Sequence, residues 1–252
     1  MRKLFFLPVL FFSCIIWSQD KALNGSYKIV KAVYGNENGN YNIDKTTIIK
    51  IFKDGYWIGA FFNNQEKTFS GSGGGTYITK NGKYIETLNF YSWDSTAVGS
   101  TYNFNYKLAS NRYFQEGKIN SAKYQDYLIK EEFEKIEAKE PLQNNSLEGV
   151  WQLENANWGG EASGLGKVKE IKIYCYPRFA WAQYHPQTGQ FIGAGGGTYS
   201  FDGKKLIEAI EYITYDMNGR SEVTLDISLD GKKGYHQKDK QNNYTESWTR
   251  LK

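Results

Sequence analysis

Short runs in which apolar and polar residues alternate recur along the whole chain. In the first half they predict strands over residues 26–32, 46–52, 56–62, 75–79, 84–93, 101–108, 112–119 and 127–136. Such alternation places successive side chains on opposite faces of a strand. Connections such as Lys53-Asp54-Gly55 and Ser110-Asn111 have the chemistry of short hairpin loops between antiparallel neighbours. The pattern therefore predicts an all-β chain.

The same pattern occurs twice. Phe69-x-Gly71-x-Gly73-Gly74-Gly75-Thr76-Tyr77 returns 122 positions later as Phe191-x-Gly193-x-Gly195-Gly196-Gly197-Thr198-Tyr199, and Ile85-Glu86 returns as Ile207-Glu208. The last strand of the first copy, Glu131-x-Phe133-x-Lys135, returns as Glu246-x-Trp248-x-Arg250. Eight consecutive short strands fit an up-and-down barrel, which removes its sheet edges by closing on itself. We expect two tandem antiparallel up-and-down β-barrels of the lipocalin-like kind, with about eight strands each.

The chain divides into four segments. Residues 1–19, with a basic start, an apolar middle and a polar end, have the form of a secretory signal peptide. A membrane anchor is the alternative, but the apolar run is shorter than the roughly 20 residues that cross a bilayer. The first barrel repeat is expected over 20–138, a linker over 139–146 and the second repeat over 147–252. We therefore expect an exported protein, periplasmic or secreted, with lipidation of Cys14 as the minor alternative.

Composition supports this fold and narrows the partners. The chain has 20 Tyr, 15 Phe, 7 Trp and 26 Gly, and aromatic side chains suit a pleated, half-buried surface. Removal of the signal leaves Cys175 as the one cysteine, so no intramolecular disulfide is expected. Removal of Arg2 and Lys3 lowers the formal net charge from +4 to +2. This gives no argument for a nucleic-acid partner.

Three common kinds of site find no support in the sequence. The glycine-rich segment is not followed by a helix, so we expect a β-bulge or barrel corner rather than a phosphate-binding loop. His185, His236 and Cys175 are far apart in sequence, which gives no argument for a metal site. The chain has no Gly-x-Ser-x-Gly motif for a nucleophilic serine. We expect neither a metal nor an organic cofactor.

The two histidines are present in the second copy alone. In the sequence alignment of the repeats, His185 and His236 stand where the first copy has Phe61 and Phe114. They are either ordinary surface or hydrogen-bonded residues, or groups that transfer protons near neutral pH. Arg178, Trp181, Tyr184, Tyr235 and Lys238 lie near them in sequence.

Glu246, Trp248 and Arg250 share one face of the last strand because they lie at i, i+2 and i+4. If they point inward, they bring a carboxylate, a stacking surface and a cation into one barrel. The alternative is a structural Arg–Glu pair that closes the barrel. Glu131 and Lys135 in the first copy favour that alternative, and Glu208, matched by Glu86, is interpreted in the same way.

A longer pattern carries a resemblance. Phe179-x-Trp181-x-x-Tyr184-x-Pro186-x-Thr188-Gly189, the glycine-rich segment, Ile207-Glu208-x-x-x-x-Tyr212 and the closing Glu246-x-Trp248-x-Arg250 resemble the small secreted lipocalin-like domains of bacterial polysaccharide-utilisation loci. In length and layout, the duplicated chain is also similar to the oligosaccharide dehydratases of loci for ulvan, an acidic algal polysaccharide. The resemblance implies a calycin-type barrel and, through the second likeness, a carbohydrate-active lyase.

Such a dehydratase would eliminate water from the non-reducing-end uronate of an acidic oligosaccharide. The reaction needs a base, an acid and a cation that neutralises the substrate carboxylate. The resemblance implies the catalytic candidates His185, His236, Tyr184 and Tyr235. It implies the substrate-binding candidates Arg178, Trp181, Tyr199, Tyr212, Glu246, Trp248 and Arg250, with Arg220 as a further cation. The expected partner is an acidic oligosaccharide, without stable membrane insertion, and the sequence leaves the oligomeric state open.

Two other classes of function fit the sequence. A non-catalytic lipocalin-like carrier or glycan-binding accessory protein would enclose its ligand in a barrel, with a largely apolar cavity and with the histidines outside it. A structural accessory protein of the cell envelope would have filled barrels and an exposed aromatic patch.

Overall fold

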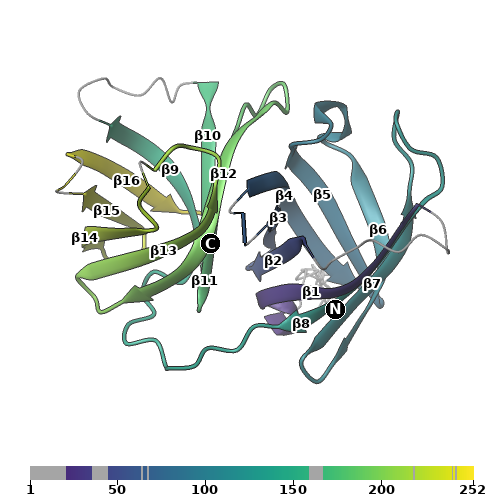
Figure 1. Ribbon diagram of the computed structural model, residues 1–252, viewed down its shortest axis with the longest axis horizontal. Helices are drawn as coiled ribbons and strands as arrows, with labels where there is room; N and C mark the ends of the chain where they lie inside the picture. Colours follow the sequence, from purple (N-terminus) through teal and green to yellow (C-terminus); the bar gives the residue numbers. More distant parts are fainter. Residues whose placement is uncertain are drawn as a thin grey trace, which may run out of the picture.

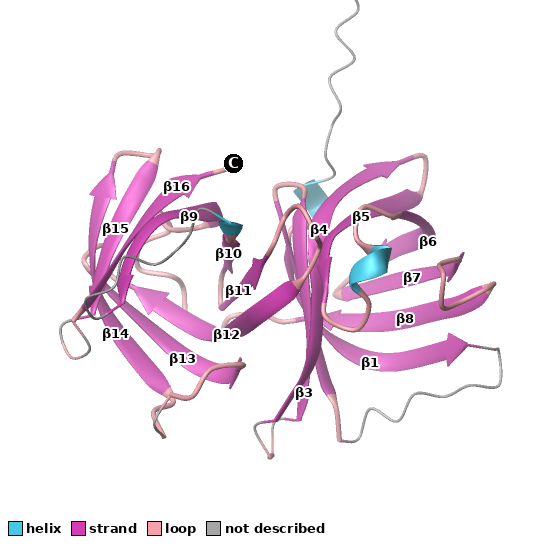
Figure 2. Ribbon diagram, turned by 90° about the horizontal axis from the view of Figure 1, so that it is seen from above, coloured by secondary structure: helices cyan, strands magenta, loops and turns pink. Residues whose placement is uncertain are grey.

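The computed structural model describes residues 21–35, 45–63, 65–66, 68–158, 167–217, 219–239, 241 and 243–252. These residues form sixteen strands in two closed barrels that lie side by side (Figures 1 and 2). The secretory signal and the lipidation site expected near the N-terminus fall outside the described residues. The expected fold class, two tandem antiparallel up-and-down barrels of eight strands, is confirmed.

The strands follow one another around each barrel. The first barrel contains β1 (Gly25–Gly35), β2 (Thr47–Lys53), β3 (Tyr56–Asn63), β4 (Thr68–Lys80), β5 (Lys83–Tyr91), β6 (Thr101–Ala109), β7 (Arg112–Ile119) and β8 (Tyr127–Lys135). The second contains β9 (Gly149–Trp158), β10 (Lys169–Cys175), β11 (Arg178–Tyr184), β12 (Phe191–Phe201), β13 (Lys205–Ile213), β14 (Glu222–Asp230), β15 (Gly234–Asp239) and β16 (Tyr244–Arg250). All neighbouring pairs are antiparallel, and β1–β8 and β9–β16 close the two rings.

Two short 3₁₀ segments accompany the strands, η1 (Lys21–Leu23) before β1 and η2 (Ser95–Ala97) between β5 and β6. Residues 139–146, expected as the linker, lie between the end of β8 and the start of β9. Among the described residues, no helix has the length and apolar character needed to cross a membrane.

The glycine-rich segments lie within β4 and β12, where each makes a β-bulge. The strand register shifts between Gly74 and Gly75 and, at the matching place, between Gly196 and Gly197. A Cβ atom on Gly197 would lie 1.9 Å from the carbonyl oxygen of Ala209 on β13. Only glycine permits so close an approach of two backbones. The expectation of a bulge rather than a phosphate loop is confirmed.

Each barrel has an aromatic core at one end. In the first, Phe52 packs edge-on against Tyr27, Tyr84 and Tyr113, with ring centroids 5.4–5.8 Å apart. In the second, Tyr235 lies between Trp151 and Trp248 at 4.8 and 5.9 Å. Buried aromatic pairs of this kind contribute about 1 kcal/mol beyond the area they bury.

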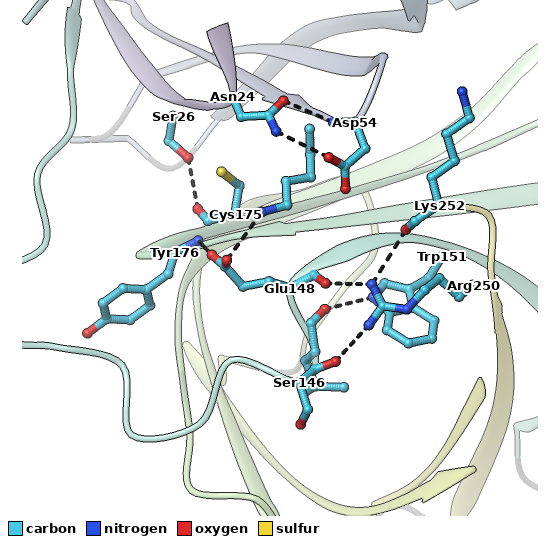
Figure 3. Close-up of polar contacts among 12 residues, drawn as sticks. Asn24, Ser26, Asp54, Ser146, Glu148, Trp151, Cys175, Tyr176, Arg250 and Lys252 are labelled. Carbon is cyan, nitrogen blue, oxygen red and sulfur yellow. Dashed lines mark hydrogen bonds and ion pairs between the residues drawn. The ribbon is translucent and has the colours of Figure 1, made fainter. Parts of the chain in front are cut away.

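A third apolar cluster joins the barrels along β2, β3, β10 and β11. Tyr212 stacks on Phe62 with centroids 4.7 Å apart, and Tyr184 stacks on Phe90 at 5.3 Å. At its edge, the Ser26 hydroxyl donates to the Cys175 carbonyl at 3.0 Å (Figure 3). These strands therefore pack on both faces. One face covers the core of their own barrel, and the opposite face contacts the neighbouring barrel.

Candidate functional site

The same four polar side chains point into each barrel. They are Lys50, Glu86, Gln115 and Glu131 in the first, and Lys172, Glu208, Gln237 and Glu246 in the second. The first three members of each set are 122 positions apart, and all four stand on equivalent strands, β2/β10, β5/β13, β7/β15 and β8/β16. A lysine and two carboxyls in each interior, all buried except the half-buried Glu246, are costly unless they are paired. These sets are therefore the best candidates for functional residues.

In the first barrel the set is fully connected. The Lys50 ammonium donates to Glu86 at 3.2 Å and to the Gln115 side-chain oxygen at 3.1 Å. The Gln115 amide donates to Glu131, which also accepts from the Tyr34 hydroxyl. Burial raises the pKa of the Glu131 carboxyl above its usual range, although Lys50 opposes the shift. The network therefore carries at most a small net charge.

This set forms the floor of a cavity of about 380 Å³. The walls are mostly aromatic, and they include Trp57, Phe61, Tyr91, Trp93, Tyr124 and Tyr127. Trp57 lies over the lysine, with the ammonium nitrogen 4.4 Å from its ring centroid. Trp93 is 39% exposed, so one large aromatic side chain reaches solvent at the rim.

The corresponding cavity of the second barrel has a volume of about 630 Å³. Lys172 donates to Glu208 at 3.4 Å and lies 4.7 Å from the Trp248 ring centroid. Glu246 accepts from Trp158, Gln237 and Trp248 at 2.8, 2.6 and 3.1 Å. Three ring and amide N–H groups thus hold the half-buried Glu246 carboxyl in a fixed orientation.

Two carboxyls in this cavity have perturbed acidities. Burial, followed by repulsion from Glu246, raises the pKa of Glu170 to about 8. Burial also raises the pKa of Glu246, and Lys172 opposes that shift. At neutral pH, Glu170 is therefore mainly protonated, because ionisation would place a further negative charge beside Glu246 and Glu208.

At the mouth of the second cavity two aromatic side chains are exposed. Trp158 is 45% exposed and Tyr215 is 44% exposed. Tyr215 also stacks on Trp181 inside the cavity, with centroids 5.8 Å apart and an interplanar angle of 15°. In the first barrel Trp93, 122 positions before Tyr215, has the corresponding place at the rim. Exposed aromatic rims are thus a shared feature of the two barrels.

The histidines do not belong to either cavity. His236 is exposed on β15 between the buried Tyr235 and Gln237, and its Nδ1 lies 2.8 Å from the Ser247 hydroxyl. His185 follows the end of β11, and its Nδ1 lies 2.7 Å from the Lys167 carbonyl oxygen. Side chains alternate between the two faces of a strand, so His236 points outward because Tyr235 and Gln237 point inward. The catalytic grouping of the two histidines with Tyr184 and Tyr235 is therefore not assembled.

The strand register also corrects the alignment of His185. Phe62 pairs with Phe69 in the first barrel, and Tyr184 pairs with Phe191 in the second. Tyr184 is therefore equivalent to Phe62, and His185 to residue 63. The residue equivalent to Phe61 is Gln183, whose side chain points into the cavity.

Four further candidates belong to the interface or the closed end. Tyr184 and Tyr212 lie in the cluster between the barrels. Arg178, on the outer face of β11, pairs with both carboxylate oxygens of Glu211. Tyr199 is buried in the core of the second barrel.

Arg250 closes the end of the second barrel. Its guanidinium lies over Trp151 at 4.0 Å and donates to the carbonyl oxygens of Ser146 and Glu148 at 2.7 Å each (Figure 3). The expectation that Glu246, Trp248 and Arg250 present a carboxylate, a ring and a cation to one ligand is met for the carboxylate alone. Trp248 lies in the core of the barrel. The Arg250 guanidinium binds backbone carbonyl oxygens at the end of the barrel away from the cavity.

The structure brings Trp181, Glu246 and Arg220 together in the second cavity. It adds residues to which the sequence analysis gave no role, chiefly Lys50, Lys172, Glu170, Gln183 and Gln237. One signal was present in the sequence: a lysine inside an apolar strand, at positions 50 and 172, recurs with the spacing of the repeat. No group of three or more metal-ligating side chains occurs among the described residues.

Comparisons with known proteins add little. No protein-family model and no curated protein matches the sequence. Among solved structures, an uncharacterized protein of Saccharomyces cerevisiae, YLR301w, is similar over 90% of this chain and 98% of its own, with 9% identity and a TM-score of 0.49. A mutant of transferrin binding protein B from Haemophilus parasuis is similar over 92% of this chain and 64% of its own, with 7% identity and a TM-score of 0.24. At these scores neither likeness carries an argument about function.

Proposed function

We propose that this protein is a lipocalin-like binding protein that holds a small polar molecule in its barrel interiors. One observation carries the proposal: in each barrel a buried Lys–Glu–Gln–Glu set lies at the floor of a cavity whose rim exposes aromatic side chains. Cavities of 300–1,000 Å³ with aromatic walls and a few convergent polar groups are typical small-molecule sites. The cavities of about 380 and 630 Å³ fall within that range.

The charge of the second cavity argues against an acidic ligand there. Glu170, Glu208 and Glu246 line it, and Lys172 is already paired with Glu208. Arg220, the other cation in the described lining, lies 3.7 Å from the Asp239 carboxylate. A uronate carboxylate would therefore enter beside these acids and compete with them for cations that are already paired. Arg178 and Arg250, the expected clamps, use their charges on Glu211 and on backbone carbonyls. We therefore favour the carrier or accessory function over elimination from an acidic oligosaccharide.

Calorimetry and thermal-shift measurements on the purified mature protein test this proposal. The panel contains neutral sugars, uronate-ended oligosaccharides, amines and small aromatic compounds. We expect a compound of this panel to bind. Gly59→Leu should fill the first cavity and Val223→Phe the second, and each substitution should abolish binding in its own barrel. The Gly59 variant should fold, because a Cβ there would meet Trp57 at an ordinary 3.4 Å. His236→Ala is the matched surface control and should bind like wild type.

Two outcomes would contradict the proposal. One is binding that survives both cavity-filling substitutions. The other is formation of an unsaturated uronate, seen as ultraviolet absorbance, that disappears on replacing His185 and His236 with alanine. That result would establish the dehydratase instead.

A further inference from the structure

The two cavities differ at three positions that touch one another. Ile48, Phe61 and Trp93 in the first barrel correspond to Glu170, Gln183 and Tyr215 in the second, each 122 positions later. In the first barrel the wall is apolar, with Phe61 edge-on to Trp93 at 5.0 Å. The second barrel has a polar group at each of the three places.

In the second barrel these groups form a chain of hydrogen bonds. The Tyr215 hydroxyl donates to the side-chain oxygen of Gln183, and the Gln183 amide donates to Glu170 at 2.6 Å. Glu170 and Gln183 are 5% and 6% exposed. Since Gln183 is oriented from both ends, it holds the Glu170 carboxyl in place from the wall of the cavity.

This series of hydrogen bonds holds the Glu170 carboxyl in an interior that already has more carboxyls than cations. Lys172 is within 3.4 Å of Glu208, and Arg220, at the mouth, lies 3.7 Å from the carboxylate of Asp239. Asp216 is a further acid at the mouth. Glu170 and Glu246 therefore have no cation of their own within ion-pair distance among the described residues. A positively charged guest would correct this imbalance.

A second, independent feature points to a hydrogen-bond donor in the guest. Gln237 is 3% exposed and lines this cavity, and its amide nitrogen donates to Glu246 at 2.6 Å. Its side-chain oxygen has no hydrogen-bond partner among the described residues. The equivalent oxygen of Gln115 in the first barrel accepts from both Lys50 and Tyr113. A buried acceptor without a donor is unfavourable, and a donor on the guest would relieve that cost.

The aromatic side chains complete the chemistry of a cation site. Trp181 and Tyr215 form a stacked wall, and Trp158 stands at the mouth. Ring faces attract ammonium groups, and the attraction is stronger when the site is desolvated.

We propose that the second barrel binds an organic ammonium ion, with the charged nitrogen among Glu170, Gln237 and Glu246 and the carbon skeleton against Trp181 and Tyr215. The first barrel, with Ile48 in place of Glu170, takes an uncharged guest. This inference rests on the proposed binding function and specifies the ligand class of one site.

Proton release should accompany binding. The guest stabilises the ionised form of Glu170, whose carboxyl is mainly protonated in the free protein at pH 7. Lys172, Glu208, Asp216, Arg220 and Glu246 are the other ionisable groups that face the same space. The window of interest is pH 6 to about 8, which lies below the pKa of Glu170. Affinity should therefore rise with pH in this window, by up to about tenfold for each unit.

Titration calorimetry with cyclohexylammonium and its uncharged counterpart cyclohexanol tests the inference. We expect the ammonium ion to bind with a proton released and at least tenfold more tightly than the alcohol. Glu170→Gln, which keeps the shape and the contact with Gln183, should weaken ammonium binding at least tenfold and remove its pH dependence. His236→Ala, a change outside both cavities, should leave ammonium binding unchanged.

A second variant protects the test against misfolding. The triple substitution Glu170→Ile, Gln183→Phe and Tyr215→Trp gives the second cavity the wall of the first, and it should abolish the preference for ammonium over the alcohol. Equal binding of the two probes, or unchanged ammonium binding in Glu170→Gln, overturns the cation inference and leaves the proposed binding function intact. Failure of every compound of the wider panel to bind either barrel overturns the binding function itself.

Discussion

Glu170 differs in chemical character from its counterpart in the first barrel. It stands on β10 two positions before Lys172, so both side chains point into the barrel. The equivalent position in the first copy is Ile48, which belongs to the apolar wall. A single exchange thus places a carboxyl with a pKa of about 8 in one of two otherwise similar interiors.

This pKa predicts how stability depends on pH. The carboxyl keeps its proton in the folded state up to about pH 8 but loses it near 4.5 in the unfolded chain. Its stabilising contribution is therefore fully present below about pH 4.5 and is lost as pH rises towards 8. Glu170→Gln has no carboxyl to ionise at this position. Between about pH 4.5 and 8, its free energy of unfolding should therefore rise relative to that of wild type by up to about 1.4 kcal/mol for each pH unit.

Urea unfolding of both proteins at pH 5 and pH 8 measures this effect. His236→Ala serves as the control, and its stability difference from wild type should be small at both values. A difference between Glu170→Gln and wild type that is the same at pH 5 and pH 8 would show that Glu170 ionises normally in the folded protein.

The sequence could predict some of these side chains but not their grouping. Glu246 and Trp181 were expected at a site, and both line the second cavity. His185 and His236 were chosen because histidines can transfer protons near neutral pH. The cavity instead contains carboxyls and amides, some of which, such as Glu208 and Gln237, recur in both copies. Alternation along β10 and β11 gave little help, because every residue of β11 and nearly every residue of β10 is buried. With both faces covered, the apolar pattern does not show which side chains face inward.

At the scale of elements, the bulges in β4 and β12 shift the register with which each strand pairs with the next. Each glycine-rich segment passes so close to the next strand that a side chain cannot fit. The repeat of this segment in both copies was enough to predict its structural role, because a feature that both barrels need appears twice.

Gly197→Ala should therefore be strongly destabilising. The added methyl group would lie 1.9 Å from the Ala209 oxygen, a backbone atom that cannot move away without breaking the pairing of β12 and β13. We expect a loss of at least about 2 kcal/mol in the free energy of unfolding. Gly59→Ala is the matched control, since its nearest contact is the Trp57 ring at 3.4 Å. Equal stability of the two variants would exclude the close approach as the reason for glycine.

At the scale of the molecule, the two barrels share an apolar interface that the repeat alone does not predict. Tyr212 stacks on Phe62 and also lies 6.2 Å from Phe69, so one ring from β13 contacts two rings of the first barrel. On the sequence, Tyr212 was a candidate for binding substrate. Its burial between the barrels gives it the different role of joining them.

Tyr212→Ala should weaken this junction. Removing a buried ring costs about 3 kcal/mol, and most of that cost should fall on the contact between barrels. We expect a second transition in calorimetric unfolding, as the barrels lose their mutual support, and a larger radius of gyration in X-ray scattering. Tyr215→Ala, at a cavity mouth, is the control and should keep one transition. A single unchanged transition for Tyr212→Ala would mean that the junction contributes little.

The central claim is that the barrel interiors are the binding sites. A crystal structure of the protein soaked with the tightest-binding compound tests it most directly. Our account predicts density inside the second barrel, against the Trp181–Tyr215 wall and within hydrogen-bond distance of the Gln237 side-chain oxygen. Density on the outer surface beside His185 or His236, with both interiors unchanged, would contradict the account.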